Sequence, residues 1–343
     1  MRKLTLIVFV ALVTAIAAAG FAEEEKGLVP KFPILGGNLK ATGFVQGTLT
    51  SSRLDGQDTD IPNARVQAEY DRGDWGGGSV ISFVDLEPDG NWLRELWVKH
   101  SLTDRLQIRF GRLFIASGNS TPSPYNLETV EYPLADVFDQ YAWGAQIRYE
   151  SDDWAAAFDI TGKPGVSFQS EENWDTPACS GRLKLKFDSG SWVAGTFQFS
   201  EDFFRLGLDG TWKPDSSLTF RGEVCYEQQS SDRASDQVGM YLFGGYRPLK
   251  NWEVVHLQMD FRQYLSKSWT ETQTSIDRKT GDVSIKTVEM SSMDAHDAVF
   301  TVGTRVFWGK DDALSLRADL QIPLDDSQAL DDARLQVLVQ LKF

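Results

Sequence analysis

The sequence predicts an all-β fold, a transmembrane, antiparallel, up-and-down β-barrel of sixteen strands. Three observations support this fold class. Short segments alternate between apolar and polar residues, connectors alternate between short and long, and aromatic residues gather beside the short connectors. A period of two places one row of side chains on each face of a strand. Segments of about ten residues with one apolar face suit a barrel with lipid outside and water inside.

The segment 335–343 shows the alternation most clearly. Its apolar face carries Leu335, Val337, Val339, Leu341 and Phe343. Its polar face carries Arg334, Gln336, Gln340 and Lys342, and Leu338 alone departs from the pattern. A soluble β-sandwich could also contain one such strand, so the fold class depends on the pattern recurring along the chain.

The alternation recurs, regularly or in weaker form, in fifteen further segments. The regular segments are 39–50, 63–70, 143–150, 154–161, 182–187, 204–212, 218–227 and 314–322. The weaker segments are 75–85, 91–101, 105–115, 191–200, 236–246, 252–265 and 297–308. Together with 335–343 they make sixteen predicted strands, each near the length that a tilted membrane-spanning strand requires.

The connectors between these strands alternate in length. Short turns rich in Gly, Pro and Asp are expected at 72–74, 151–153, 188–190, 213–215, 247–248 and 309–311. Longer loops are expected at 51–60, 116–139, 163–178, 228–235, 266–296 and 324–332, with short exceptions near 86–90 and 200–202. Short turns at one end and long loops at the other are typical of transmembrane barrels, whereas a soluble sandwich has no reason to alternate.

Aromatic residues lie on the apolar parity beside the short turns. They are Tyr70, Trp75, Tyr149, Trp154, Trp212, Tyr246, Trp308 and Phe343. Amphipathic rings favour the headgroup level of a membrane, so this pattern indicates an aromatic girdle at the periplasmic side. The alternative is a set of core aromatics in a sandwich, which need not cluster at one end of the strands.

Residues 1–22 have the features of a cleaved secretory signal. Two basic residues precede an apolar run that ends at Ala19, and small residues follow. The run is shorter than the roughly 20 residues of a membrane-spanning helix, which disfavours an amino-terminal anchor. We therefore expect residues 23–38 to form a short periplasmic lead-in and residues 39–343 to form the barrel.

The composition limits the partners of the chain. Its net charge is −15, and removal of the leader, which holds two basic and no acidic residues, makes the charge −17. This acidic balance excludes nucleic acid, which requires a basic face. Cys179 and Cys225 fall on separate, non-adjacent predicted strands, so we expect free thiols.

Signatures of enzymes are missing from the sequence. The three histidines, His100, His256 and His296, have no metal-ligand spacing with cysteine or acidic residues. No nucleophile elbow, nucleotide-binding loop or dinucleotide fingerprint stands in a usable context. We therefore expect no catalytic residue, no bound metal and no cofactor.

The predicted strand 91–101 breaks the alternation. Arg94 lies on one of its faces and Lys99 on the other, so either phase leaves charge facing outward. A Lys or Arg at the lipid midplane costs about 2–4 kcal/mol. One hypothesis is that this wall faces another protomer, with the glycines at 76–78 allowing close approach. The alternative is a β-bulge that resets the phase.

The polar faces of the predicted strands carry many charges. The bases are Arg65, Arg109, Arg148, Arg182, Lys184, Lys186, Arg205, Arg221, Arg262, Arg305, Arg317 and Arg334. The acids are Glu69, Asp159, Asp209, Glu223, Asp260 and Asp319. A lumen lined with charge holds water, and sixteen strands make a barrel wide enough for a channel. Each arginine could instead be the structural partner of an inward acid.

Arg182, Lys184 and Lys186 form the densest basic row, which Arg205 extends on a later strand. Like charges on one strand face repel unless water, anions or acids neutralise them. The row is therefore either a path for anions or a solvated wall opposite acidic outer loops.

The third outer loop, 116–139, is long and acidic. At this point the chain resembles the bacterial outer-membrane porins. The stretches Arg109-Phe110-Gly111-Arg112 and Tyr125-Asn126-Leu127-Glu128 look most like the phosphate-selective porin family. In the porin superfamily the third loop of a sixteen-stranded barrel folds into the lumen and narrows the pore. The acidic loop departs from the phosphate-selective members, whose constriction is reached by many basic residues.

The resemblance implies a constriction between loop carboxylates and wall cations. The loop side would be Glu128, Glu131, Asp136 and Asp139. The wall side would be Arg65, Arg94, Arg109 and Arg148, with Arg94 depending on the phase of its strand. Opposed charges across a narrow gap create a transverse field that orients dipolar solutes and sets ion preference.

The sequence thus predicts an outer-membrane porin, a water-filled channel for passive diffusion of small hydrophilic solutes and ions. One alternative is an anion channel that prefers a phosphate-like substrate and uses the basic row. A barrel-embedded hydrolase would need a Ser-His-acid set, and an adhesin would conduct nothing. The expected partners are outer-membrane lipid, lipopolysaccharide and small solutes, and the resemblance implies a homotrimer.

Overall fold

The computed structural model describes residues 31–34, 37–52, 56–83, 93–115, 141–162, 176–231, 235–265, 267–276, 283–291, 295–309, 312–324 and 333–342. Within these ranges the chain is almost entirely β-structure. The strands are β1 (Lys31–Ile34), β2 (Gly37–Ser52), β3 (Gly56–Arg72), β4 (Trp75–Ser82), β5 (Leu93–Ser101), β6 (Leu106–Phe114), β7 (Tyr141–Glu150), β8 (Trp154–Thr161), β9 (Ala178–Lys186), β10 (Trp192–Ser200), β11 (Phe203–Trp212), β12 (Leu218–Gln229), β13 (Asp236–Tyr246), β14 (Trp252–Leu265), β15 (Ser268–Ile276), β16 (Val283–Ser291), β17 (Ala295–Trp308), β18 (Leu314–Pro323) and β19 (Arg334–Lys342). No described helix is long and apolar enough to cross a membrane.

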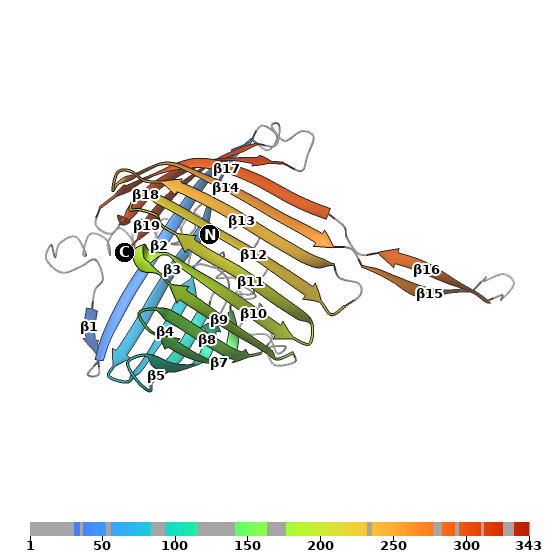
Figure 1. The fold of residues 1–343 in the computed structure, drawn as a ribbon, viewed down its shortest axis with the longest axis horizontal. Helices are drawn as coiled ribbons and strands as arrows, with labels where there is room; N and C mark the ends of the chain where they lie inside the picture. Colours follow the sequence, from blue (N-terminus) through green and yellow to red (C-terminus); the bar gives the residue numbers. More distant parts are fainter. Residues whose placement is uncertain are drawn as a thin grey trace, which may run out of the picture.

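In the described residues, seventeen strands form one sheet, and sixteen of them close into a ring. Consecutive strands pair from β2 to β14 and again from β17 to β19. The strand β14 pairs with β17, and β19 returns to pair with β2. The seventeenth strand, β1, pairs with residues 37–40 at the start of β2, whereas β19 pairs with residues 44–52 of β2. All these pairs are antiparallel, and the result is an up-and-down barrel of tilted strands (Figure 1).

The predicted fold class is confirmed, and each of the sixteen predicted strands corresponds to one strand of the ring. Closure follows from the alternation, because a sheet with one apolar and one polar face separates lipid from water only when it has no open edge. The sequence predicts these strands correctly because period-two patterning is a local property of the sequence.

Two predicted loops are wrong. Most of 51–60 is strand, because β2 runs to Ser52 and β3 begins at Gly56. The loop 266–296 contains a separate hairpin of β15 and β16, which projects away from the barrel in Figure 1. The hairpin strands are rich in Thr and Ser and have no continuous apolar face, so hydrophobic alternation does not reveal them. The predicted lead-in, 23–38, also includes β1.

The two ends of the barrel differ in their connectors. We call the end with the connectors 73–74, 102–105, 151–153, 187–191, 213–217, 247–251 and 309–313 the short-turn end. The opposite end, where the chain crosses from β6 to β7 and from β14 to β17, is the long-loop end. The predicted signal at 1–22 and the third loop at 116–139 lie outside the described residues.

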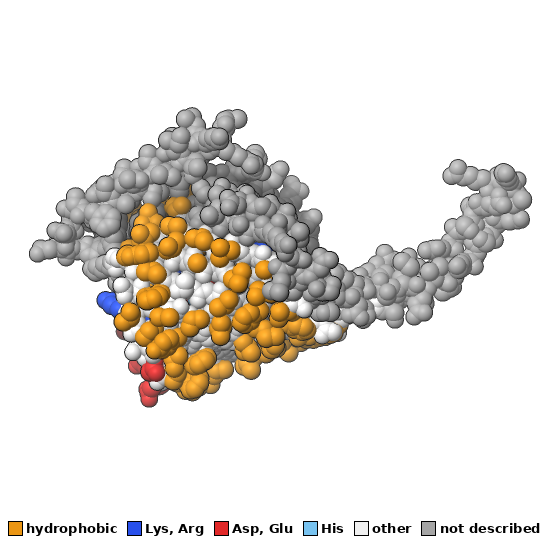
Figure 2. Space-filling model, turned by 90° about the horizontal axis from the view of Figure 1, so that it is seen from above, with side chains coloured by type: hydrophobic (Ala, Val, Ile, Leu, Met, Phe, Trp, Pro, Cys, Tyr) orange, Lys and Arg blue, Asp and Glu red, His pale blue; other side chains and the backbone are white. Residues whose placement is uncertain are grey.

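The barrel has the reverse polarity of a soluble protein. Large hydrophobic side chains are exposed on the outer wall; Ile160 is 59% exposed and Leu208 is 56% exposed. Polar side chains on the opposite faces are buried, and Asp159, His256 and Asp319 are completely inaccessible. Figure 2 shows one face of the molecule on which hydrophobic side chains predominate, with acidic side chains gathered at an edge. Such an outer wall suits hydrocarbon, since water would disfavour so much exposed apolar surface.

The predicted aromatic girdle is present at the short-turn end. Its exposed members include Trp75, Trp212 and Trp308. Neighbouring rings stack, with centroids 4.4 Å apart for Tyr149 and Trp154. Aromatic pairs of this kind add about 0.5–1.5 kcal/mol beyond their buried area. Phe343, the last predicted member, lies outside the described residues.

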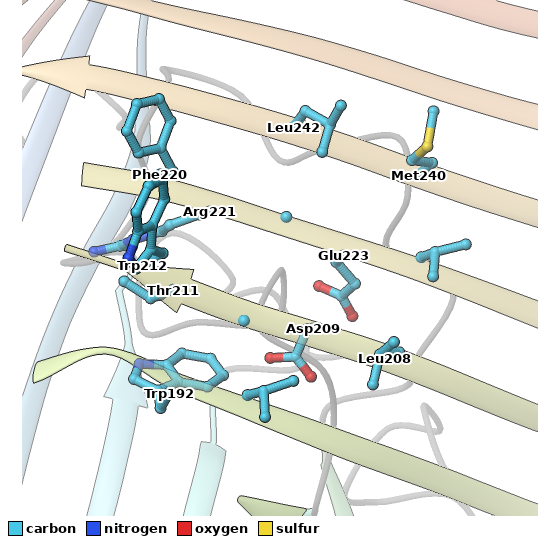
Figure 3. Close-up of a pocket in the computed structure, with 14 residues that line it drawn as sticks. Trp192, Leu208, Asp209, Thr211, Trp212, Phe220, Arg221, Glu223, Met240 and Leu242 are labelled. Atoms are coloured by element: carbon cyan, nitrogen blue, oxygen red, sulfur yellow. The ribbon is translucent and has the colours of Figure 1, made fainter. Parts of the chain in front are cut away.

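The outer wall also carries a shallow apolar recess of about 500 Å³ across β10 to β13 (Figure 3). Gly210 and Gly222 pair directly across β11 and β12 at its centre, where the missing side chains leave space. Leu208, Phe220 and Leu242 surround it. Because it opens on the hydrophobic outer wall, this recess is not a candidate for the channel.

The β-bulge alternative for strand 91–101 is confirmed, so its charges do not require a neighbouring protomer. Val80 pairs with Glu95 while Ile81 pairs with Leu93, so Arg94 is the extra residue. Beyond the bulge Leu96 and Val98 are exposed on the outer wall. Glu95, Trp97 and Lys99 are thereby directed inward.

The inward side chains of β5 explain the glycines at 76–78. A Cβ on Gly78 would lie 2.6 Å from the indole of Trp97, and a Cβ on Gly76 would lie 2.5 Å from Lys99 Cε. Lys99 itself forms an ion pair of 2.5 Å with Asp71. These glycines make room for inward side chains of the same chain, not for a neighbouring protomer.

We expect Leu208→Lys to lower the free energy of unfolding from a bilayer by about 2–4 kcal/mol, because the new charge would face hydrocarbon near the middle of β11. Urea titration in lipid vesicles measures this change. Leu249→Lys is the matched control, since Leu249 is equally exposed but lies in the connector between β13 and β14. Equal costs for the two variants would contradict the assignment of the outer wall to lipid.

Candidate functional site

Three of the four arginines expected on the constriction wall lie around one carboxylate. Arg65 of β3, Arg109 of β6 and Arg148 of β7 all interact electrostatically with Glu95 of β5. The sequence pattern does not indicate Glu95, because the bulge beside it changes the alternation of its strand. We call Arg65, Arg94, Arg109, Arg112 and Arg148 the arginine cluster.

Aromatic side chains orient the members of this cluster. The Arg109 guanidinium lies over the ring of Trp97, 4.4 Å from its centroid, and the Trp97 indole N–H donates to Glu95 at 3.1 Å. Arg65 donates to the hydroxyl of Tyr141 at 3.3 Å. A guanidinium held flat against a ring keeps its planar donor fork in a fixed direction.

Arg94 and Arg112 extend the cluster towards the long-loop end. The Arg94 guanidinium lies 5.8 Å from the centroid of the Tyr141 ring. Arg112 interacts electrostatically with Arg94 and Tyr141, and its side chain is completely buried. Arg94 therefore lies beside the same ring as Arg65, and Arg112 is an additional member that strand parity would place outside, beside Phe110.

Gly111 explains the position of Arg112. Its φ of +132° is a conformation that L side chains rarely adopt, and a Cβ there would overlap the carbonyl oxygen of Leu96. The adjacent positions of β6 do not follow simple alternation, since Arg112 and Leu113 are both buried. A glycine inside a strand is the sequence signal that could have indicated this change.

The basic row on β9 is largely neutralised by neighbouring groups. Arg182 binds Asp209 through two hydrogen bonds of 2.7 and 2.6 Å, and Lys186 donates to Glu150 at 2.8 Å. Lys184 lies 4.0 Å from the centroid of the Trp192 ring. These contacts favour the alternative of a structural, solvated wall over a continuous path for anions.

Arg205 lies apart from that row and has its own acid. It donates to Glu227 at 2.5 Å and to Gln198 at 2.7 Å, while its guanidinium covers the ring of Phe203. Charge-assisted hydrogen bonds between neighbouring strands stabilise the inner wall by about 1.5–3 kcal/mol each. Arg205 is therefore a structural partner more than a member of a ladder.

A second buried network lies on β14 and β18. Both ring nitrogens of His256 face carboxylates, with Nδ1 2.8 Å from Glu253 and Nε2 2.9 Å from Asp319. Because carboxylates only accept, both hydrogen bonds form when both nitrogens carry hydrogens. Through these two contacts, His256 connects Glu253 of β14 with Asp319 of β18.

The residues expected on the loop side of the constriction lie outside the described residues. They are Glu128, Glu131, Asp136 and Asp139. Within the part of the chain that the structure describes, no group of three or more His, Cys, Asp or Glu side chains could hold a metal ion. Cys179 and Cys225 do not form a disulfide, as expected, and the Cys225 thiol donates to the carbonyl oxygen of Gly239.

Comparison with solved structures places the barrel among known architectures. The anion-selective porin from Comamonas acidovorans matches with a TM-score of 0.60 and 12% identity over 90% of this chain and 100% of that chain. OmpF of Salmonella typhi, in complex with daunomycin, matches with a TM-score of 0.59 and 10% identity over 92% and 100%. The chain has the fold of the bacterial outer-membrane porins.

A further solved structure with this porin fold is a loop L8 deletion mutant of OmpT, an outer membrane protein of Vibrio cholerae. It matches with a TM-score of 0.61 and 9% identity over 90% of this chain and 99% of that chain. Neither protein-family models nor curated proteins match the sequence. The resemblance to the porins is thus confirmed as a likeness of fold, and the closer resemblance to the phosphate-selective family stays a prediction.

We expect Gly111→Ala to destabilise the porin fold by about 1–3 kcal/mol, because it forces a Cβ into a positive-φ conformation against the backbone of β5. Urea titration monitored by tryptophan fluorescence measures the loss. Gly195→Ala is the control, since a Cβ at Gly195 meets nothing within 4 Å. Equal stability of the two variants would contradict the predicted strain at Gly111.

Proposed function

We propose that the chain is a porin of the bacterial outer membrane that lets small hydrophilic solutes and ions diffuse through a water-filled lumen. In this proposal residues 1–22 direct export and are removed, and lipid and lipopolysaccharide surround the outer wall. The short-turn end faces the periplasm, as its aromatic girdle and tight turns favour. Diffusion needs neither a catalytic group nor a cofactor.

One observation carries the proposal: a ring of sixteen strands has charged and amide side chains on its inner face and apolar side chains on its outer face. Barrels of this size leave space for an aqueous channel, whereas small barrels are filled by side chains. The solved structures of similar fold include an anion-selective porin, which supports a channel as the function.

A second candidate is a channel that prefers anions. The arginine cluster favours it, because five guanidiniums surround Glu95 and Tyr141 on one side of the lumen. A wall lined by one sign of charge raises the local concentration of the opposite ion. The row of Arg182, Lys184 and Lys186 contributes less to this preference, since Asp209 and Glu150 neutralise two of its members.

Planar-bilayer recording tests both candidates. We expect stepwise conductance, and under a salt gradient we expect Arg109→Gln with Arg148→Gln to shift the reversal potential towards cation preference. Lys184→Gln with Lys186→Gln, which removes the same number of charges, is the comparison. A larger shift from the β9 pair would favour the anion ladder, and a complete lack of conductance would remove the channel itself.

The proposal includes a homotrimer, supported by a similar solved structure, an in-vitro folded OmpT of Vibrio cholerae described as a trimer form. The charges of β5 no longer support this assembly, because they point inward. We expect native mass spectrometry in detergent to give three times the mass of the chain. A clean monomer under conditions that keep the barrel folded would contradict the trimer and leave the channel untouched.

A further inference from the structure

A cavity of about 680 Å³ lies at the short-turn end of the inner wall. It spans β12, β13, β14, β17 and β19 together with the connectors 213–217, 247–251 and 309–313. Neither the arginine cluster nor the β9 row contributes a residue to its lining. A solute that leaves the lumen at this end would pass it.

Basic side chains outnumber acidic ones among the described side chains that line the cavity. The five bases are Lys213, Arg221, Arg247, Arg305 and Lys342, and the three acids are Asp215, Glu253 and Asp312. The lining therefore carries a net charge of about +2, although the whole chain is strongly acidic. A concave site with excess positive charge attracts anions.

Each of the three acids is engaged by a neighbouring group of the protein. Asp215 accepts hydrogen bonds from the backbone N–H groups of Ser217 and Leu218, which hold the pKa of its carboxyl below the usual range together with the Ser217 hydroxyl. Glu253 binds His256, and Asp312 binds Arg247. The carboxylates thus hold turns and strands together, and their positions follow from those contacts.

Two guanidiniums of the cavity are oriented by one aromatic ring. Arg247 and Arg305 lie 3.8 and 4.6 Å from the centroid of Phe307. Arg305 also donates to neutral acceptors, Ser315 and Gln340, at 3.2 and 3.3 Å. Guanidiniums fixed in this way lose little side-chain freedom on binding, and their planar forks match carboxylate and phosphate.

We propose that this cavity binds a small multivalent oxyanion, a di- or tricarboxylate or a phosphate, at the short-turn mouth of the pore. The inference rests on the proposed channel function and deepens it, because it names the class of solute that binds inside the channel during its passage. Multivalency follows from the lining, since five bases from three strands and two turns face one space.

Single-channel recording with citrate or inorganic phosphate added to one side at a time tests this site. We expect at least one of the two probes to interrupt the current at lower concentration from the short-turn side than from the long-loop side. Acetate, with a single charge, is expected to have little effect. Block by citrate alone or by phosphate alone identifies the class of oxyanion.

Lys213→Gln combined with Lys342→Gln should raise the half-blocking concentration about tenfold, because two charge-assisted contacts are removed. Arg262→Gln is the control, since it removes a lumen charge on β14 near the long-loop end. Normal conductance without block by either probe would overturn the site. Equal weakening by the control would also overturn it, because the effect would then belong to the lumen charge as a whole.

If no conductance is seen, equilibrium dialysis of radiolabelled citrate and phosphate against the folded protein in detergent decides the question separately. Saturable binding of either probe, weakened by the Lys213→Gln and Lys342→Gln pair but not by Arg262→Gln, would support the site without the channel. A lack of saturable binding to folded protein would overturn it. Tryptophan fluorescence establishes that each variant is folded.

Discussion

The structure depends on one constraint, the pairing of every backbone N–H and C=O group of a wall that water does not reach from outside. In hydrocarbon an unpaired backbone group costs several kcal/mol, so a sheet edge cannot face lipid. The return of β19 to β2 satisfies this constraint by closing the ring. Once the ring is closed, each strand has only an outer and an inner face, and period-two alternation divides its residues between lipid and lumen.

The same closure sets the electrostatics of the lumen. Inward charges of nearby strands lie side by side, so many of them bind one another, as Arg182 of β9 and Asp209 of β11 do across β10. Such pairs stabilise the wall and contribute little net field. The arginine cluster around Glu95 and the basic cavity at the short-turn end are different, because bases outnumber acids among their described side chains. In the channel that we propose, these two regions lie at different depths of the lumen and are two places that favour anions.

Local departures from the regular sheet decide which side chains reach these regions. The bulge at Arg94 turns Leu96 and Val98 outward and Glu95, Trp97 and Lys99 inward, which removes charge from the lipid face of β5. Gly111, with its positive φ, brings Arg112 into the buried side of β6 against strand parity. Both changes cost regular pairing over one or two residues and gain charged groups for the lumen wall.

The sequence by itself determined the class of fold, the sixteen ring strands, the aromatic girdle and the inward position of Arg65, Arg109 and Arg148, because each follows from alternation within a single strand. Only the tertiary structure decided which charges meet. Glu95 and Arg112 joined the arginine cluster, the β9 row found its acids, and the cavity beneath Phe307 formed from residues more than a hundred positions apart. Register between strands and the direction of a bulge are set by contacts across the sheet, which a pattern along one strand does not contain.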